Sequence, residues 1–296
     1  MTNDEYGTSN IQNLRQIRSS LTGNVQEKFD SLLLGSPISV GTLSNKPLDQ
    51  DGKLEQLKNL ADDRLIVGCI YCGGKEATRE HVPSRVFLDA PLPENLSVVG
   101  ACRPCNNGFS LDEEYFACLV ESVIAGSADP KDIKRANVAN ILRRTPALRA
   151  KLEAAKSCVD GQTQFSIELE RVRNVVVKLA RGHAAFELSQ PCKDEPASVW
   201  WGPLALMDEK QRQEFESSHV VEGYGEIGSR GMQRLLVAQF TLQSESGETK
   251  TVGLLVNDWV EVQEGRYRYH AIDYGDAAKI KLVISEYLAC EIVWDL

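Results

Sequence analysis

The spacing of apolar residues changes along the chain, from a helical period in the first half to a period of two in the second. Amphipathic patterns predict helices over residues 11–21 and 26–34, and a polar stretch predicts a short helix over 53–64. Farther on, Ser110 and Glu113 have the spacing of a capping box. We therefore expect an apolar helix to begin there.

The middle of the chain is basic and helical, and the second half is rich in strand patterns. A segment over residues 131–156 predicts a helix that is interrupted at Pro146. From about residue 163, alternating apolar and polar residues predict strands over 164–172, 234–242, 249–256, 266–272 and 279–285. A polar helix is expected over 207–219. These elements predict an α+β fold with a mainly antiparallel sheet.

Charge and composition narrow the class of protein. The formal net charge of −9 argues against a nonspecific nucleic-acid coat, because such proteins are normally basic. It does not exclude a nucleic-acid enzyme, since local basic patches and bound cations set the field at a site. The N-terminus lacks the pattern of a secretory signal, and no apolar run approaches the length of a membrane span. We expect a cytoplasmic protein without a membrane partner, in which thiols stay reduced.

Four of the eight cysteines form two Cys-x-x-Cys pairs. Cys69 and Cys72 make the first pair, and Cys102 and Cys105 make the second. Two such pairs suit a tetrahedral zinc ion, and four thiolates leave no open position for water, so a zinc ion there would be structural. The alternative is four unrelated reduced thiols. The remaining cysteines are expected to be small buried hydrophobic residues: Cys118, Cys158, Cys192 and Cys290.

The residues around the second pair follow the order of a known motif. Glu80 and His81 come first, Asn95-Leu96 lies 14 residues after His81, and Asn106 directly follows Cys105. In this order, over about residues 66–118, the chain resembles the HNH, or ββα-metal, endonucleases. Asn107 is an alternative to Asn106, because the interval after Asn95 is longer than is usual in that family.

The resemblance implies a zinc-bearing ββα domain that hydrolyses phosphodiester bonds, with DNA ahead of RNA as the substrate. The reaction needs a nucleophilic water and a cation for the developing charge. Glu80 and Asn106 offer the oxygen ligands that Mg²⁺ or Mn²⁺ prefers, and His81 is free to act as general base. The family assigns Asn95 to holding the loop and the base in place through hydrogen bonds.

The expected organisation has four parts. These are an N-terminal helical segment (1–63), an HNH domain with structural zinc (64–126), a basic helical linker (127–160) and a C-terminal α+β domain (161–296). For the last part we expect a role in specificity, regulation or oligomerisation. The protein would then act as a homo-oligomer or with an activating partner. By analogy alone, a nuclease joined to such a domain would suit bacterial defence.

Several basic residues are candidates for phosphate binding, with a solvated surface as the alternative. Arg79, Arg85 and Arg103 flank the predicted centre. A second cluster comprises Lys131, Lys134, Arg135, Arg143, Arg144, Arg149 and Lys151. His183, His219 and His270 are dispersed and are expected to be core or surface residues.

Three hypotheses stay open. The first is a metal-dependent endonuclease, and the second is a catalytically silent zinc scaffold that binds DNA or protein. The third is an interaction protein whose function lies in residues 160–296. The joint presence of Glu80, His81, Asn95 and Asn106 favours the first, because a pure scaffold does not need these four together.

Overall fold

The computed structural model describes residues 38–39, 67–94, 96–159, 161–221, 229–243 and 249–296. The helices predicted at 11–21, 26–34 and 53–64 lie outside these residues, as does Asn95. The chain divides into two compact units. Unit 1 combines Met1–Ala61 with Met207–Trp259, and unit 2 combines Asp62–Leu206 with Val260–Leu296. The predicted domain boundaries at 126 and 160 therefore both fall within unit 2.

The centre of unit 2 is a five-stranded antiparallel sheet with the order β10-β11-β12-β13-β6. Its strands are β6 (Ser198–Pro203), β10 (Val260–Gln263), β11 (Tyr267–Asp273), β12 (Ala277–Ile284) and β13 (Leu288–Asp295). The predicted strands at 266–272 and 279–285 correspond to β11 and β12. The α+β class and the mainly antiparallel pairing are therefore confirmed.

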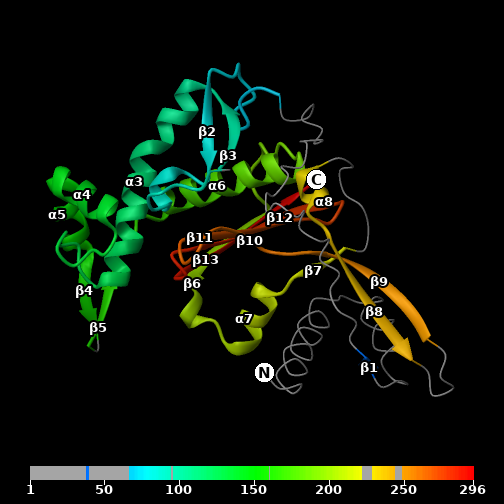
Figure 1. Ribbon diagram of the computed structural model, residues 1–296. Helices are drawn as coiled ribbons and strands as arrows, with labels where there is room; N and C mark the ends of the chain where they lie inside the picture. The colour runs from blue at the N-terminus through cyan, green and yellow to red at the C-terminus, as the bar shows by residue number, and fades with distance from the viewer. Residues whose placement is uncertain (1–37, 40–66, 95, 160, 222–228, 244–248) are drawn as a thin grey trace. The chain divides into compact units, whose positions relative to one another are not determined.

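Helix α6 (Leu169–Leu188) covers one face of this sheet, and a hairpin packs on the other side of the helix (Figure 1). The hairpin consists of β2 (Thr78–Val82) and β3 (Ser97–Ala101). Because α6 has protein on both sides, most of its residues are buried, including Val175, Val176 and Ala180. Helix α6 thus forms the layer between the sheet and the hairpin.

The predicted strand over 164–172 is wrong in its second half. Strand β5 (Gln162–Phe165) ends early, and α6 begins at Leu169. Ile167 and Leu169, which suggested the alternation, are 39% and 59% exposed. The buried residues from Val172 onward instead recur at helical spacing, and their burial determines the local structure.

Helix α3 (Arg103–Ala125) begins before the predicted capping box. Cys102 is its N-cap, and Gly126 ends it in the left-handed conformation with φ +66°. The Ser110 hydroxyl donates to the Asn107 carbonyl inside the helix, so it does not cap a helix start. The early start follows from the second cysteine pair, because Cys102 Sγ accepts from the Cys105 N–H at 3.5 Å.

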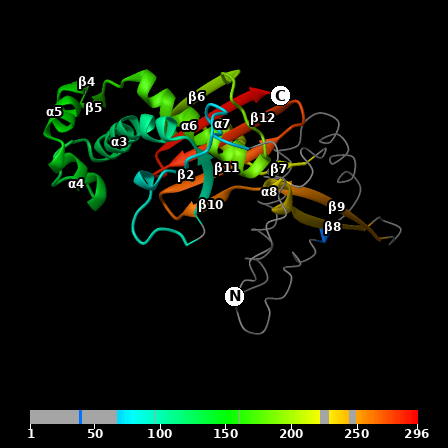
Figure 2. The ribbon, with the colours of Figure 1, turned by 90° about the horizontal axis from the view of Figure 1, so that it is seen from above.

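The basic segment forms two helices, as Pro146 suggested. Helix α4 (Ala136–Arg144) and helix α5 (Pro146–Ala155) lie near the end of α3 that is farthest from the hairpin (Figure 2). Pro146 begins α5, where a missing N–H costs nothing. Strands β4 (Lys156–Val159) and β5 follow as a short hairpin. Cys158 on β4 is exposed, which corrects its predicted burial, whereas Cys118, Cys192 and Cys290 are buried.

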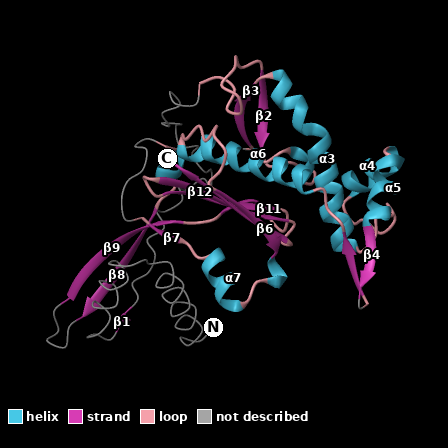
Figure 3. Ribbon diagram, turned by 180° about the vertical axis from the view of Figure 1, so that it is seen from behind, coloured by secondary structure: helices cyan, strands magenta, loops and turns pink. Residues whose placement is uncertain are grey.

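Unit 1 contains an antiparallel sheet with the order β1-β8-β9-β7 (Figure 3). Its strands are β1 (Ile38–Ser39), β7 (His219–Val220), β8 (Leu236–Gln243) and β9 (Thr249–Asn257). The predicted strands at 234–242 and 249–256 match β8 and β9, and the predicted polar helix matches α7 (Glu209–Glu216). A short helix, α8 (Arg230–Gln233), precedes β8. In the described part of the chain, no helix is long and apolar enough to cross a membrane.

Candidate functional site

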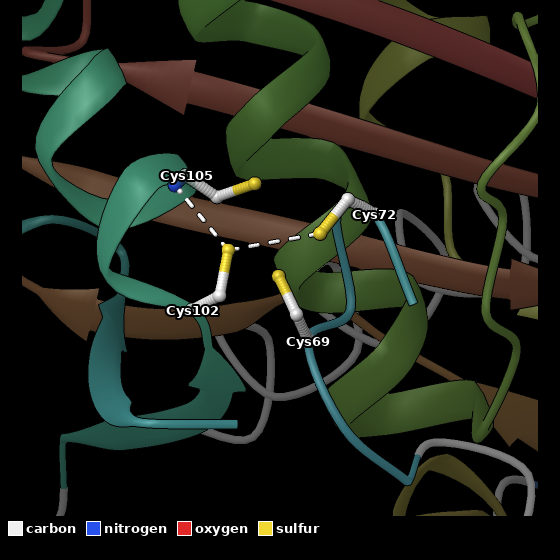
Figure 4. Close-up of side chains that lie close together, drawn as sticks. All are labelled: Cys69, Cys72, Cys102 and Cys105. Carbon is white, nitrogen blue, oxygen red and sulfur yellow. Dashed lines mark hydrogen bonds between the residues drawn. The ribbon is translucent and has the colours of Figure 1, made fainter. Parts of the chain in front are cut away.

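The two cysteine pairs come together at the start of α3. Cys69 and Cys72 lie in the turn before β2, while Cys102 caps α3 and Cys105 lies in its first turn. The four sulfur atoms lie within 4.8 Å of one another and point toward a common centre (Figure 4). The turn after Cys69 is tight, with the Gly73 N–H donating to the Cys69 carbonyl at 2.8 Å. Gly73 has φ +75°, a conformation that glycine adopts without strain.

The chemistry of this cluster suits a metal ion such as zinc. Burial would raise the pKa of the Cys69 thiol, but hydrogen bonds from backbone groups outweigh burial and lower it to about 7. The N–H groups of Gly74 and Cys105 also donate to Cys72 Sγ and Cys102 Sγ, at 3.4 and 3.5 Å. Four sulfur donors at this separation fit tetrahedral coordination and leave no position for a substrate. A metal held here would therefore fix local structure.

Strand β2 places Glu80 and His81 side by side on the hairpin. Glu80 pairs with Val99 and His81 pairs with Val98 on β3. Because neighbouring residues of a strand face opposite sides, the two side chains have different surroundings. Glu80 is 9% exposed, whereas His81 is half-buried.

A cavity of about 320 Å³ brings most of the predicted site residues together. Glu80, His81, Asn106, Asn107, Arg79 and Arg85 line it, together with Ser84, Val86, Ser110 and Glu113. Arg103 is exposed and does not line it. Residues 30 positions apart in the chain thus share one cavity, because the hairpin returns the chain to the first turns of α3.

Asn106 and Asn107 differ in their surroundings. The Asn106 side-chain amide donates to Thr78 Oγ1 at 3.1 Å, which fixes its orientation next to β2. Asn107 is exposed, and its backbone carbonyl accepts from the Ser110 hydroxyl. A ligand amide benefits from being held in place, so the geometry favours Asn106 over Asn107.

The structure adds a residue that the sequence motif did not include. Lys178 on α6 is 2% exposed, and its Nζ lies 2.6 Å from Glu80 Oε1 and 2.5 Å from Glu113 Oε1. Its ammonium group also donates to Ser84 Oγ at 2.5 Å, and the Ser84 hydroxyl donates to Glu113. A buried cation with two carboxylates and a hydroxyl has all three of its protons engaged. We refer to Glu80, Ser84, Glu113 and Lys178 as the lysine cluster.

The sequence did contain a signal for Lys178. It lies within the apolar run VVVKLA, in a helix whose neighbouring residues are buried. A buried lysine is rarely found without an acidic partner. The signal does not identify the partners, since Glu80 is 98 residues away in the chain.

The lysine cluster changes what Glu80 can do. One carboxylate oxygen, Oε1, is engaged by Lys178, which leaves the second oxygen for a ligand. The cavity also contains the Glu113 carboxylate and the two asparagine amides. This donor set is made of oxygen, as a hard divalent cation requires, and it is small enough for such an ion to keep water ligands.

His81 is held in the form that can accept a proton. Partial burial lowers the pKa of its imidazole, and the nearby charges of Arg85 and Lys178 lower it further, while Glu80 acts in the opposite direction. A neutral imidazole is therefore the main form at neutral pH. His183 and His270, in contrast, are fully buried in the core.

The basic cluster of 131–151 separates into structural and accessible residues. Arg135 is 3% exposed, bonds to Asp89 at 2.8 Å and donates to the carbonyls of Val86 and Leu88. Arg149 pairs with Asp129 at 3.0 Å, and Lys151 pairs with Glu168 at 2.6 Å. Arg143 and Arg144 are exposed and bond to Asn140, an uncharged partner. These two remain as candidate phosphate contacts.

Comparison of the chain with protein-family models, with curated proteins and with solved structures gives no match. The resemblance to the HNH nucleases stays a prediction from the motif residues between 69 and 106. Function is therefore inferred from the side chains and the geometry of this chain.

Proposed function

We propose that the chain is a metal-dependent endonuclease that hydrolyses phosphodiester bonds of DNA, with a structural zinc ion held by the four cysteines. The observation that carries this proposal is the cavity shared by Glu80, His81 and Asn106. Glu80 and His81 lie between the two cysteine pairs in the chain, and Asn106 directly follows Cys105. An ordinary exposed loop would not bring a fixed amide, a buried carboxylate and a neutral imidazole to one cavity. The order of a hairpin followed by a helix is also the order that the HNH resemblance implies.

Each side chain has a defined role in the proposed reaction. Glu80 and Asn106 would hold Mg²⁺ or Mn²⁺, which would offset the charge that develops on the phosphate and on the leaving oxygen. His81 accepts a proton from the attacking water, because its lowered pKa keeps the imidazole neutral. Arg79 and Arg85 are exposed at the cavity and bind phosphate oxygens.

Residues that do not touch the substrate hold this site in place. Lys178 fixes the Glu80 carboxylate through its bond to Oε1. The cysteine cluster fixes the first turn of α3, since Cys105 directly precedes Asn106 and the Asn106 N–H donates to the Cys102 carbonyl at 3.0 Å. The zinc ion thus has an indirect role, in positioning the Asn106 amide.

The experiment compares wild type with His81→Ala on supercoiled plasmid, linear DNA and RNA, with and without Mg²⁺ or Mn²⁺. We expect wild type to convert supercoiled plasmid to nicked or linear forms only with a divalent cation. We expect His81→Ala to be slower by about 10²–10⁴-fold, the usual contribution of a general base. His219→Ala, a histidine of unit 1 outside the cavity, is the matched control and should keep wild-type activity.

Bound zinc is counted by elemental analysis on the same samples, so that the metal centre and the activity are tested separately. One zinc per chain supports the structural centre, and its absence contradicts it. Wild type that cuts nothing with any ion, or a His81→Ala variant that cuts equally well, would show that the enzymatic proposal is wrong.

A second candidate function is a zinc scaffold that binds DNA or protein without cutting. The lysine cluster is the observation that favours it, because Lys178 already neutralises the carboxylate that a divalent cation would need. Binding of DNA by wild type and by His81→Ala, with no cleavage by either, is the expected result for the scaffold.

A further inference from the structure

A second concave surface adjoins the candidate site. It is a groove of about 780 Å³, within the range of about 300–1,000 Å³ that is usual for ligand sites. Its accessible apolar part consists of Val86, Ala90 and Leu92, and the side chains of Leu88 and Ile141 are buried beneath it. Its charged part consists of Arg85, Arg143 and Arg144. We refer to this surface as the arginine groove.

The arginine groove shares part of its lining with the cavity of the candidate site. Arg85 and Val86 line both of them. Arg85 is exposed, so its guanidinium is accessible to a ligand that runs from one to the other. A polymer whose reacting phosphate lies in the cavity would therefore meet the arginine groove next.

The charges of the groove are available to an anion. Arg143 Nη1 donates to the Asn140 side chain at 2.6 Å, and Arg144 Nε donates to the Asn140 carbonyl at 3.3 Å. Among the described residues, neither arginine forms an ion pair with a carboxylate. Three other cations of the basic segment, Arg135, Arg149 and Lys151, form ion pairs with carboxylates, as described above. The groove thus presents positive charge that no described carboxylate compensates.

We propose that the arginine groove binds an unpaired stretch of DNA that flanks the scissile phosphate. The arginines bind its phosphates, and the apolar part takes up an unstacked base. This inference rests on the proposed function, because the occupant is the same DNA strand that enters the cavity. The proposed substrate class is therefore DNA that has a single-stranded segment next to the cleaved bond.

The composition of the groove favours an unpaired strand over a duplex. In a duplex, the bases are stacked inside and present only their edges to a protein, so they cover less of an apolar concave surface than an exposed base face does. A single strand exposes the faces of its bases, and these can pack on apolar side chains and on guanidinium planes. Leu92 is 39% exposed, so its apolar surface is accessible to such a base.

Binding is tested without cleavage. The full chain, without added divalent cation, is titrated onto a labelled single-stranded oligonucleotide and onto its blunt duplex, with fluorescence anisotropy as the readout. Wild type should bind the single strand more tightly. The double variant Arg143→Ala, Arg144→Ala should lose about tenfold or more in affinity for it, and the slope of log K against log salt should fall by about 1.4, for two phosphates at about 0.7 each.

A matched control removes the same charge from the same segment. Lys131→Ala, Lys134→Ala changes two exposed lysines that line neither the groove nor the cavity. We expect it to keep wild-type affinity for the single strand within about twofold. Equal losses in the two double variants would mean that net charge alone sets binding, and the proposal would be overturned.

The apolar contact has its own variant. Leu92→Ser removes apolar surface and leaves all three arginines in place, so it should weaken single-strand binding without changing the salt slope. An unchanged affinity, or equal binding of duplex and single strand by wild type, would overturn the unpaired strand as occupant. The plasmid assay separates the two proposals: metal-dependent cleavage together with these negative binding results would leave the endonuclease standing and remove only the groove.

Discussion

Lys178 is the side chain on which the candidate site most depends. Its side chain is 1% exposed, and the side chains of Glu80 and Glu113 are 11% and 12% exposed. A buried ion pair gives little net stability, but removal of one partner leaves an uncompensated buried charge. Here the loss of the lysine would leave two carboxylates beside each other.

We predict that Lys178→Met destabilises the chain by about 3–5 kcal/mol. The reason is the unpaired negative charge, because methionine fills a similar volume. Urea unfolding followed by circular dichroism measures the change. The double variant Lys178→Met, Glu113→Gln should recover part of the stability, since one of the two charges is then gone. If the glutamine gives no recovery, the loss comes from packing and the charge argument is wrong.

The pH dependence of cleavage reports on His81. The pKa of its imidazole lies below the usual value of 6.5, so the neutral base is present above that lowered pKa and is lost as the pH falls through it. We predict that the cleavage rate declines toward acid pH in a limb with a midpoint below about 6.5 and is level at pH values well above that midpoint. Single-turnover rates across pH measure the limb. A midpoint above 6.5 would contradict the environment described for His81.

At the residue scale, the sequence motif predicted which residues share the cavity, but it did not predict their ion pairs. The sequence placed Glu80, His81 and Asn106 as candidates, and the structure brings these three to one cavity. Lys178 and Glu113 could not be paired with them from the sequence, because their bonds form only once α6 packs on the hairpin. Spacing predicts local geometry, whereas ion pairs between distant segments depend on the tertiary structure.

At the scale of elements, the approach of α6 to β2 is set by one glycine. A Cβ at Gly182 would lie 2.8 and 2.9 Å from the two methyl groups of Val82. Lys178 precedes Gly182 by one helical turn, so both residues face the hairpin. The close approach therefore brings the lysine within reach of Glu80.

We predict that Gly182→Ala destabilises the chain by about 1–3 kcal/mol, although alanine is the better helix former. The stiff Val82 side chain cannot turn away, so the helix has to move. The double variant Val82→Ala, Gly182→Ala should be more stable than the sum of the single changes predicts. Unfolding free energies of the four proteins measure this coupling, and strict additivity would contradict the contact.

The elements also show where periodicity misleads. The capping-box pattern predicts the N-cap of α3 at Ser110, eight residues after the observed N-cap at Cys102. The start of α6 was predicted as a strand because Phe165, Ile167 and Leu169 alternate. In these two places, the Cys102 cap and the burial of apolar residues override local propensities that are worth a few tenths of a kcal/mol.

At the scale of the whole molecule, the sheet of unit 2 is interrupted in sequence. Strands β6 and β10 lie at its two edges, and the segment Met207–Trp259 of unit 1 connects them. Four strand spacings of about 4.8 Å separate the edges by about 19 Å. The two ends of this segment are therefore far apart, whereas the two ends of a simple surface loop lie close together.

We predict that a Gly/Ser linker of about twelve residues can replace 207–259 without loss of bound zinc. A linker of this length has a root-mean-square span of about 19 Å, whereas one of two residues cannot reach across. Elemental analysis and near-ultraviolet circular dichroism compare the two deletions. If both lose zinc, the cysteine cluster depends on the deleted segment.

The place of α6 in the fold also has a consequence for synthesis. Helix α6 packs on α3 and on the hairpin, which precede it in the chain, and also on β11, β12 and β13, which follow it by about 80 residues or more. During synthesis, the face of α6 that is turned toward the sheet therefore has no partner strands until residues 260–296 have been added. The apolar side chains of that face would be exposed to water during this interval, which makes it the time at which the growing chain is most prone to aggregate.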